Sequence, residues 1–442
     1  MRGSVVMAAV LIAMLLMAAP GSAWSAELRE PAIRGEAAPR PLLREDSHRP
    51  AEAPSAAAID SVSAEDGAAA GVQLASKALA ASRIAYGPRD ARTVTPLVNL
   101  AHAKQRAGDT SAALIDYRMA IELAEKAGGP RDPRLYEAWN GAAYAHLAAG
   151  QFESAVEAYE TALQLHRVNQ GLYSEEQLGL LHALAIATRA SGKAEDADEW
   201  QMRRLDVGQR QYALGTPEVA QLYVSVGRWY RSVGRANEAI GLHALAVEIL
   251  EKSSKDDPRL IEPLIELALS GSERRRGVDE GPLPGSLQPA AALSRAEKLA
   301  DARSDGAASD RARSLIRLGD VHMGLARKEA ALRVYAKASA LLASTGEKAP
   351  FEEPVFLKFQ PPRPDPIPGK PGYVLAEFDI DDNGKVKDVK IIETQPSVLP
   401  PAVGARLSAA LRAARLRPRI ENGKTVASKG LRYRLPVRGG SA

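Results

Sequence analysis

Apolar and polar residues alternate over residues 373–380, where every second side chain is apolar. The apolar positions are Val374, Ala376, Phe378 and Ile380. A period of two residues predicts a β-strand with one buried face. The dipeptide Asn383-Gly384 follows, and its tolerance of positive φ angles favours a tight hairpin turn. We therefore expect a return strand over residues 385–394.

A helix and a third strand complete this pattern. Pro400 and Pro401 predict a helix start, because proline is tolerated in the first turn of a helix. The apolar residues that follow share one helical face, namely Val403, Leu407, Ala410, Leu411 and Ala414. Apolar side chains alternate again along residues 430–437, which places Arg432 and Arg434 on the outward side. Residues 372–438 are thus predicted to form a small α+β domain with the order β-β-α-β.

This block resembles the C-terminal domain of TonB-type energy transducers. The matching segments are Y-V-L-A-E-F-D-I, D-D-N-G-K-V, A-R-L-R-P-R, N-G-K-T-V and L-R-Y-R-L-P-V. Members of that family bind short extended segments of outer-membrane receptors in the periplasm and transmit force from an inner-membrane motor.

The last strand of the block is expected at a sheet edge, where unpaired N–H and C=O groups can be completed by an extended peptide. The family's use of this binding mode implies a partner-binding edge formed by Leu431, Arg432, Tyr433, Arg434 and Leu435. Basic residues on an edge strand also protect against aggregation, and the sequence leaves both interpretations open.

Glycine recurs at a constant spacing of 42 residues in the preceding part of the chain, at Gly108, Gly150, Gly192 and Gly234. A fixed period of this size predicts an α-solenoid of helix pairs. The most regular unit, residues 136–165, resembles the longer variant of the tetratricopeptide repeat. We expect about six helix pairs over residues 71–345. Residues 258–303 are expected to be irregular, and Pro282, Pro284 and Pro289 imply a loop insertion there.

The concave face of such a solenoid is lined by the first helix of each pair. The polar residues expected there are Asn99, His102, Arg106, Asn140, Arg189, Arg228 and Arg231. Their side-chain donors suit an extended peptide or an acidic segment of a protein partner. The alternative is that they are ordinary solvated side chains.

The first 26 residues combine an early arginine, an apolar run over residues 5–19 and a set of small residues. This is the pattern of a secretory signal peptide, and the run is shorter than the roughly 20 residues that a membrane-spanning helix needs. We expect export to the periplasm, with retention as an inner-membrane anchor as the alternative. The run lacks the polar residue through which TonB-type transducers contact their motor. Residues 27–70 are predicted to be a flexible linker, and residues 346–371 a proline-rich connector.

Composition and motifs limit the kinds of catalytic, metal-binding and cofactor-binding sites that the chain can form. The chain contains no cysteine, which excludes disulfides and thiolate metal sites. Residues 379–390 place oxygen donors as in a calcium-binding loop, but Lys390 stands where a bidentate glutamate is required. None of the seven histidines forms a recognisable ligand pair, and no nucleophile or phosphate-binding motif is present. We therefore expect a non-enzymatic protein without metal or cofactor.

Charge is distributed unevenly. Residues 349–442 contain 16 Lys/Arg and 10 Asp/Glu, a net of +6, against −2 for the remainder. A basic region suits an anionic partner such as cell-wall polymer or an acidic protein, although it also serves solubility, and export argues against nucleic acid. We expect an exported protein of the cell envelope that engages protein partners through both modules; the resemblance implies outer-membrane receptors and a link to transport. The alternative is a structural envelope adaptor that binds cell-wall polymer and recruits other proteins.

Overall fold

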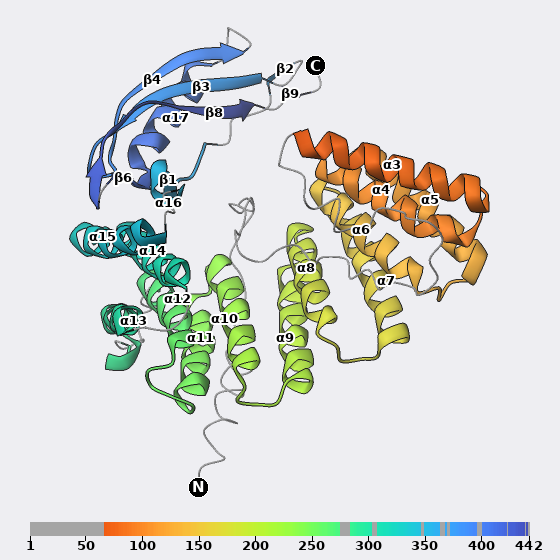
Figure 1. The fold of residues 1–442 in the computed structure, drawn as a ribbon, viewed down its shortest axis with the longest axis horizontal. Helices are drawn as coiled ribbons and strands as arrows, with labels where there is room; N and C mark the ends of the chain where they lie inside the picture. Colours follow the sequence, from red (N-terminus) through yellow and green to blue (C-terminus); the bar gives the residue numbers. More distant parts are fainter. Residues whose placement is uncertain are drawn as a thin grey trace. The chain divides into compact units, whose positions relative to one another are not determined.

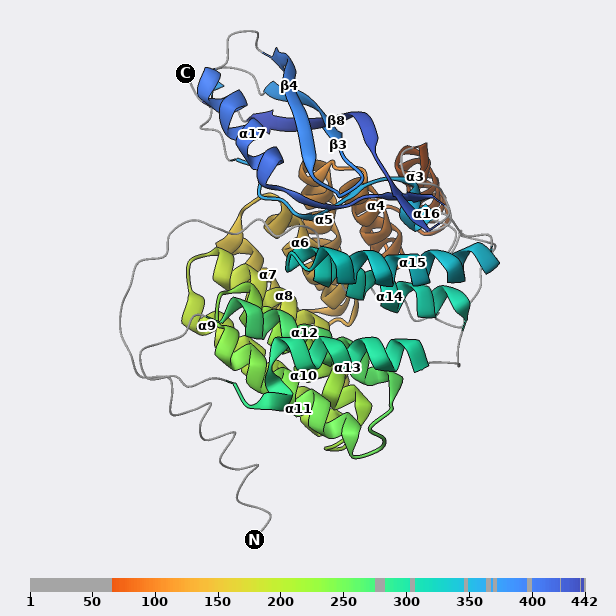
Figure 2. The same cartoon turned by 90° about the vertical axis from the view of Figure 1, so that its left-hand side faces the viewer.

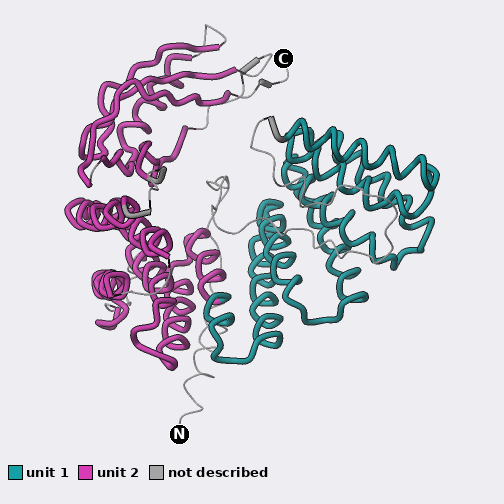
Figure 3. The backbone as a smooth tube through the Cα atoms, in the orientation of Figure 1, with its two compact units in different colours: residues 1–222 teal, residues 223–442 magenta. Residues whose placement is uncertain are grey.

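The computed structural model describes residues 66–274, 283–302, 307–345, 349–362, 367–368, 372–395, 400–421, 423–437 and 439–440. The chain separates into two compact units, residues 1–222 and 223–442 (Figure 3). The predicted signal peptide and most of the predicted linker lie outside the described residues.

The first unit is built from antiparallel helix pairs (Figure 1). Its elements are α3 (Asp66–Tyr86), η1 (Ala91–Thr93), α4 (Val94–Arg106), α5 (Thr110–Gly128), α6 (Arg134–Ala148), α7 (Phe152–Gln170), α8 (Glu176–Ala190) and α9 (Ala194–Gln211). Gly108, Gly150 and Gly192 make the turns within the pairs, with φ between +75° and +91°. Glycine adopts this conformation without steric cost, so the 42-residue glycine series marks the turns.

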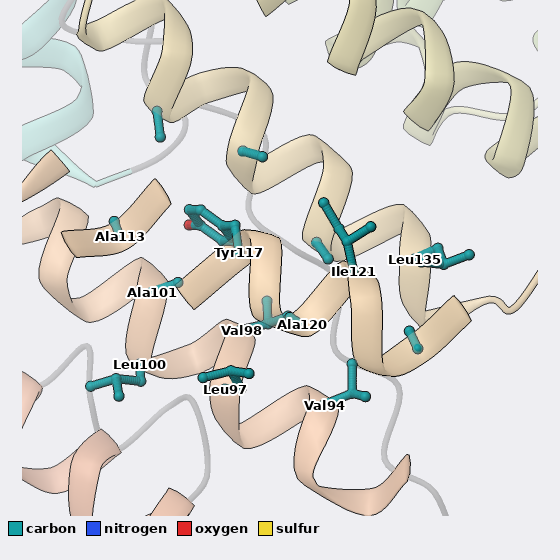
Figure 4. Close-up of a cluster of buried hydrophobic side chains, with 14 of the residues drawn as sticks. Val94, Leu97, Val98, Leu100, Ala101, Ala113, Tyr117, Ala120, Ile121 and Leu135 are labelled. Carbon is teal, nitrogen blue, oxygen red and sulfur yellow. The ribbon is translucent and has the colours of Figure 1, made fainter. Parts of the chain in front are cut away.

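Alanine and tyrosine fill the space between the helices. Tyr117 and Tyr159 are fully buried, and Ala155 at the start of α7 has no exposed surface. Figure 4 shows Tyr117 between α4 and α6, and a Cβ atom added at Gly141 would lie 2.4 Å from its ring. Trp139 of α6 is only partly buried and packs against the clusters on both sides of this helix.

The second unit begins within α10 (Pro217–Ser232) and continues with further helix pairs. These elements are α11 (Ala236–Glu251), η2 (Pro258–Leu260), α12 (Ile261–Glu273), η3 (Gly285–Leu287), α13 (Pro289–Ala302), α14 (Ala308–Gly324) and α15 (Lys328–Thr345). The expectation that residues 258–303 are irregular is wrong for most of this stretch. It forms the pair α12–α13, because α12 buries a nearly continuous apolar surface and Pro289 stands at the first position of α13, where its missing N–H costs nothing.

The C-terminal part of this unit is a small α+β region. Its elements are α16 (Ala349–Glu352), β1 (Val355–Lys358), β2 (Ile367–Pro368), β3 (Gly372–Ile380), β4 (Val386–Gln395), α17 (Pro401–Ala413), β5 (Arg415–Arg417), β6 (Arg419–Glu421), β7 (Lys424–Val426), β8 (Ser428–Val437) and β9 (Gly439–Gly440). An antiparallel sheet has the strand order β4-β3-β8, and α17 covers one of its faces (Figure 2). Leu407 and Leu411 of α17 pack there against Val374 and Ala376.

Part of the predicted connector is folded onto this region. β1 pairs with β5 in antiparallel register. The ring of Phe356 lies 4.6 Å from that of Phe359 and 6.1 Å from those of Phe378 and Tyr433. These aromatic contacts hold residues 355–359 against the α+β region. The proline-rich composition of the surrounding segment did not suggest such packing.

Candidate functional site

Strand β8 forms one edge of the three-stranded sheet. It pairs with β3 on one side, from Phe378 opposite Leu431 to Gly372 opposite Val437. Among the described residues no strand pairs with its other side. The strand predicted to bind a partner therefore presents a free edge.

The direction of the β8 backbone groups follows from the pairing of β3. The N–H of Asp381 donates to the carbonyl of Lys385 at 3.0 Å across the hairpin to β4. Backbone groups of successive residues point to opposite sides of a strand, so odd-numbered residues of β3 face β4 and even-numbered residues face β8. The β8 partners of the even-numbered residues include Leu431, Tyr433 and Leu435. The N–H groups of Arg432 and Arg434 therefore point away from the sheet.

Pro436 supports this assignment independently. It belongs to the same outward-facing series as Arg432 and Arg434, and it has no N–H to donate. A strand tolerates proline where the missing donor would have faced solvent.

The opposite edge, β4, is less regular. Its register with β3 shifts twice, between Leu375 and Ala376 and between Glu377 and Asp379. Asp388 adopts a φ of +50° at the second shift. Such bulges break the row of backbone groups that a new strand would need. β8 pairs without a shift from Leu431 to Val437, so it is the better template.

The outer face of β8 is basic. The Nε of Arg432 lies 3.3 Å from a carboxylate oxygen of Glu377 on β3, and its side chain is 64% exposed. The guanidinium carbon of Arg434 lies 3.8 Å from the centre of the Tyr373 ring, a cation–π contact. The hydroxyl of Tyr373 donates to Glu393 on β4.

The inner face of β8 is apolar. Leu435 is buried, whereas Leu431 and Tyr433 are half-buried. Tyr433 meets Phe359 edge to face at 5.0 Å, and burial raises the pKa of its hydroxyl. Both faces therefore have the alternation expected from the sequence.

The segment that resembles a calcium-binding loop in sequence forms a hairpin turn in the structure. One carboxylate oxygen of Asp381 accepts the N–H groups of Asn383 and Lys385, each at 2.9 Å. Lys387 pairs with the other carboxylate oxygen. Among the described residues, no group of three or more histidine, aspartate or glutamate side chains is arranged to hold a metal ion. None of the described helices has both the length and the apolar character needed to cross a membrane.

The polar residues predicted on the first helices of the first unit differ in environment. His102 meets Tyr117 edge to face at 5.4 Å, and burial, with Arg106 nearby, lowers its pKa to about 4. Asn140 is buried, Asn99 and Arg189 are half-buried, and Arg106 is exposed. His102 is therefore a neutral packing residue at neutral pH.

In the second unit, Arg228 and Arg231 of α10 form ion pairs with glutamates of α12. Arg228 pairs with Glu266 at 2.9 Å and also with Glu262, while Arg231 pairs with Glu266 at 3.3 Å and with Glu273 at 3.2 Å. Arg317 of α14 reaches Glu266 at 2.5 Å.

Burial of Glu266 acts to raise the pKa of its carboxyl. Arg231, Arg228 and Arg317 outweigh that effect and hold the pKa below its usual value. Sequence reasoning missed Glu266, although it lies three 42-residue periods after Asn140 and so occupies the same repeat position.

A contact between α14 and β5 was also not predicted. Nη1 of Arg417 lies 3.1 and 3.2 Å from the two carboxylate oxygens of Asp320. The hydroxyl of Tyr335 donates to Asp320 at 2.7 Å, and Arg417 lies over the ring of Phe351 at 5.8 Å. Arg415 donates to the carbonyl of Gly324 beside this pair. An ion pair flanked by the rings of Tyr335 and Phe351 thus joins the last helix pair to the α+β region.

Comparison with known proteins identifies one of the repeats. Residues 136–169 match the tetratricopeptide repeat family. This segment is the α6–α7 pair, which contains the unit predicted over residues 136–165. No curated protein matches the chain.

Solved structures with similar helix arrangements are distant in sequence. The TPR-like repeats of a kinesin light chain from Podosopora anserina are 20% identical, with a TM-score of 0.38, over 43% of this chain and 90% of that one. BtubC from P. vanneervenii is 19% identical with a TM-score of 0.37, over 70% and 96% of the two chains. RapI is 15% identical with a TM-score of 0.39, over 67% and 80%. At this distance nothing about partners is transferred to this chain.

Proposed function

We propose that this protein is an exported, non-enzymatic binding protein of the cell envelope. Its α+β region, which resembles the TonB C-terminal domain, takes an extended segment of a partner protein onto β8, and its repeats hold a second protein. The resemblance suggests an outer-membrane receptor as the first partner and a link to transport. The signal-peptide pattern of residues 1–26 supports export to the periplasm.

The free edge of β8 is the observation that carries this proposal. Arg432 and Arg434 point their N–H groups away from β3, and the edge runs without a bulge as far as Val437. An added strand would complete these groups, and each backbone hydrogen bond contributes about 0.5–1.5 kcal/mol net. Affinity then depends mainly on the backbone, with side chains setting the choice of partner.

The repeats are the second binding element. In the second unit, Arg228 and Arg231 already pair with glutamates of α12. The predicted residues of the first unit include Asn140 on α6 and Arg189 on α8, and we propose that a peptide is held there by the first helices.

Proline substitutions on β8 separate strand addition from binding to an anionic cell-wall polymer. Arg432→Pro and Arg434→Pro each remove one outward N–H while leaving the bonds to β3 in place, as Pro436 already does. Arg432→Gln and Arg434→Gln remove the charge and keep the N–H. Tyr433→Pro is unsuitable, because it removes an N–H that faces β3 and a side chain that packs on Phe359.

The variants are titrated with a peptide copied from an extended periplasmic segment of an outer-membrane receptor and with a soluble peptidoglycan fragment. Strand addition predicts a large loss of peptide binding for the prolines and a modest loss for the glutamines. Polymer binding predicts similar losses for the proline and glutamine variants, because both remove the same charge, and a steep salt dependence, since exposed charges are screened over about 8–10 Å. Peptide binding that both prolines leave intact would rule out the β8 edge.

A further inference from the structure

We infer that the segment added to β8 is acidic at two positions two residues apart, with an apolar residue between them. This inference rests on the proposed strand addition and specifies its ligand. It follows from which side chains stand next to the outward N–H groups of β8.

Residues directly opposite each other in an antiparallel pair share one face of the sheet, with Cβ atoms about 4.5–5.5 Å apart. All pairings in this sheet are antiparallel. An antiparallel strand bonded to the N–H groups of Arg432 and Arg434 therefore places two of its side chains beside those guanidinium groups. Carboxylates are the side chains that pair with guanidinium groups in that position.

The two arginines differ in what they already contact. Arg432 has a carboxylate partner in Glu377 at 3.3 Å. Arg434 contacts the ring of Tyr373, and no carboxylate among the described residues pairs with it. An incoming acid gains a new charge pair at Arg434 but shares Arg432 with Glu377. The position opposite Arg434 is therefore the stronger determinant.

The residue between the two acids faces the other side of the sheet. It lies opposite Tyr433, whose ring is packed against Phe359 and Phe356. Aromatic side chains pair well across strands with β-branched and aromatic residues. A valine, isoleucine or aromatic residue fits this position, and a charged residue does not.

The same arginines disfavour a second copy of this chain as the occupant. Two β8 strands paired antiparallel about Tyr433 would set Arg432 of each copy opposite Arg434 of the other. Like charges directly opposite one another destabilise a strand pair. The basic residues thus select against self-association and for an acidic segment.

Four acetylated peptides with the same threonine- and valine-rich flanks test the inference on the full-length protein. Their central residues are Glu-Val-Glu, Thr-Val-Thr, Lys-Val-Lys and Glu-Glu-Val. The last has the charge of the first but places its acids on opposite faces. We expect the Glu-Val-Glu peptide to bind tightest, with each acid giving about a 1.5- to 5-fold gain, and Arg434→Gln to reduce that preference more than Arg432→Gln. Lys429→Gln, an exposed neutralisation on the same strand, is the matched control.

N-methylation distinguishes the failure of this inference from failure of strand addition. Methylating the backbone nitrogen of one glutamate blocks an N–H that faces β8, whereas methylating the central valine blocks one that faces away. If only glutamate methylation weakens binding but Thr-Val-Thr or Glu-Glu-Val binds as well as Glu-Val-Glu, strand addition stands and the acidic preference is wrong. If no peptide binds, or both methylations act alike, the proposed function fails with it.

Discussion

Asp320 of α14 and Arg417 of β5 form an ion pair at 3.1 Å that joins the last repeat helices to the α+β region. The side chain of Arg417 is 10% exposed and that of Asp320 is 29% exposed. Tyr335 and Phe351 enclose the pair. The two residues are 97 positions apart in the chain, so this contact couples elements that the sequence presents as separate modules.

Removing either partner of this pair should destabilise the second unit. Arg417→Ala leaves the carboxylate of Asp320 largely enclosed without its cation, which costs about 3 kcal/mol, the low end for a buried pair, because Asp320 keeps some solvent contact. Asp320→Ala should behave similarly. The double variant should lose less than the sum of the two, which urea unfolding of all three variants measures. Arg419→Ala, whose partner Glu421 is exposed, is the control and should cost less than about 1 kcal/mol. Strictly additive losses would mean that the pair is not coupled.

Glu266 should be the most sensitive acidic residue of the repeats. It is fully buried between Arg228, Arg231 and Arg317. Glu266→Gln leaves three guanidinium groups facing a neutral amide and should cost about 3–5 kcal/mol in unfolding free energy. Glu273→Gln, which affects an exposed partner of Arg231, should cost less than about 1 kcal/mol. Equal effects of the two variants in chemical denaturation would contradict the network.

Glu137 on α6 should make the stability of the first unit depend on pH. Burial raises the pKa of its carboxyl to about 7 from an ordinary value of 4.5. The folded state therefore binds this proton more tightly than the unfolded state, so protonation of Glu137 stabilises the fold. This stabilisation is fully present below the unfolded pKa. It is lost as pH rises from about 4.5 to 7, which lowers the unfolding free energy by about 1–3 kcal/mol. Glu137→Gln should remove this component, as seen in the difference between the two unfolding curves from pH 4 to 8. A variant that follows the wild type across that range would refute the assignment.

Ala155 should tolerate no charged side chain. It has no exposed surface where α7 packs on its neighbours, so Ala155→Asp buries an unpaired carboxylate and should cost several kcal/mol. Ser154→Asp adds the same charge at an exposed neighbouring position and should change stability by less than about 0.5 kcal/mol. Circular-dichroism melting of both variants gives the comparison, and similar melting temperatures would show that the repeat register is misassigned.

Periodic features of the sequence predict much of this fold. Alternation over residues 373–380 corresponds to β3, and the 42-residue glycine series corresponds to the turns of the helix pairs. The α12–α13 pair was missed because the prolines near Pro289 suggested a loop, whereas that residue starts a helix. The hydrophobic period and the turn-forming residues depend only on residues that are close in sequence, so both can be predicted from the sequence alone.

Contacts between distant segments could not be read in this way. The sequence suggests Arg228 and Arg231 as ligand-binding residues, but it does not reveal that Glu266 lies beside them. Nor does it reveal the position of Arg417 against Asp320. Which outward N–H groups of β8 are free became clear only from the register with β3. Such pairings depend on tertiary packing, which no local pattern specifies.

Amide hydrogen exchange on the full-length protein, with and without the Glu-Val-Glu peptide, tests the central claim most directly. Strand addition predicts that the amides of Arg432 and Arg434 exchange quickly in the free protein and become protected when the peptide binds. Those of Leu431, Tyr433 and Leu435 should be protected in both states, and those of β4 should not change. Binding that leaves the Arg432 and Arg434 amides unprotected, or that protects β4 instead, would contradict the account.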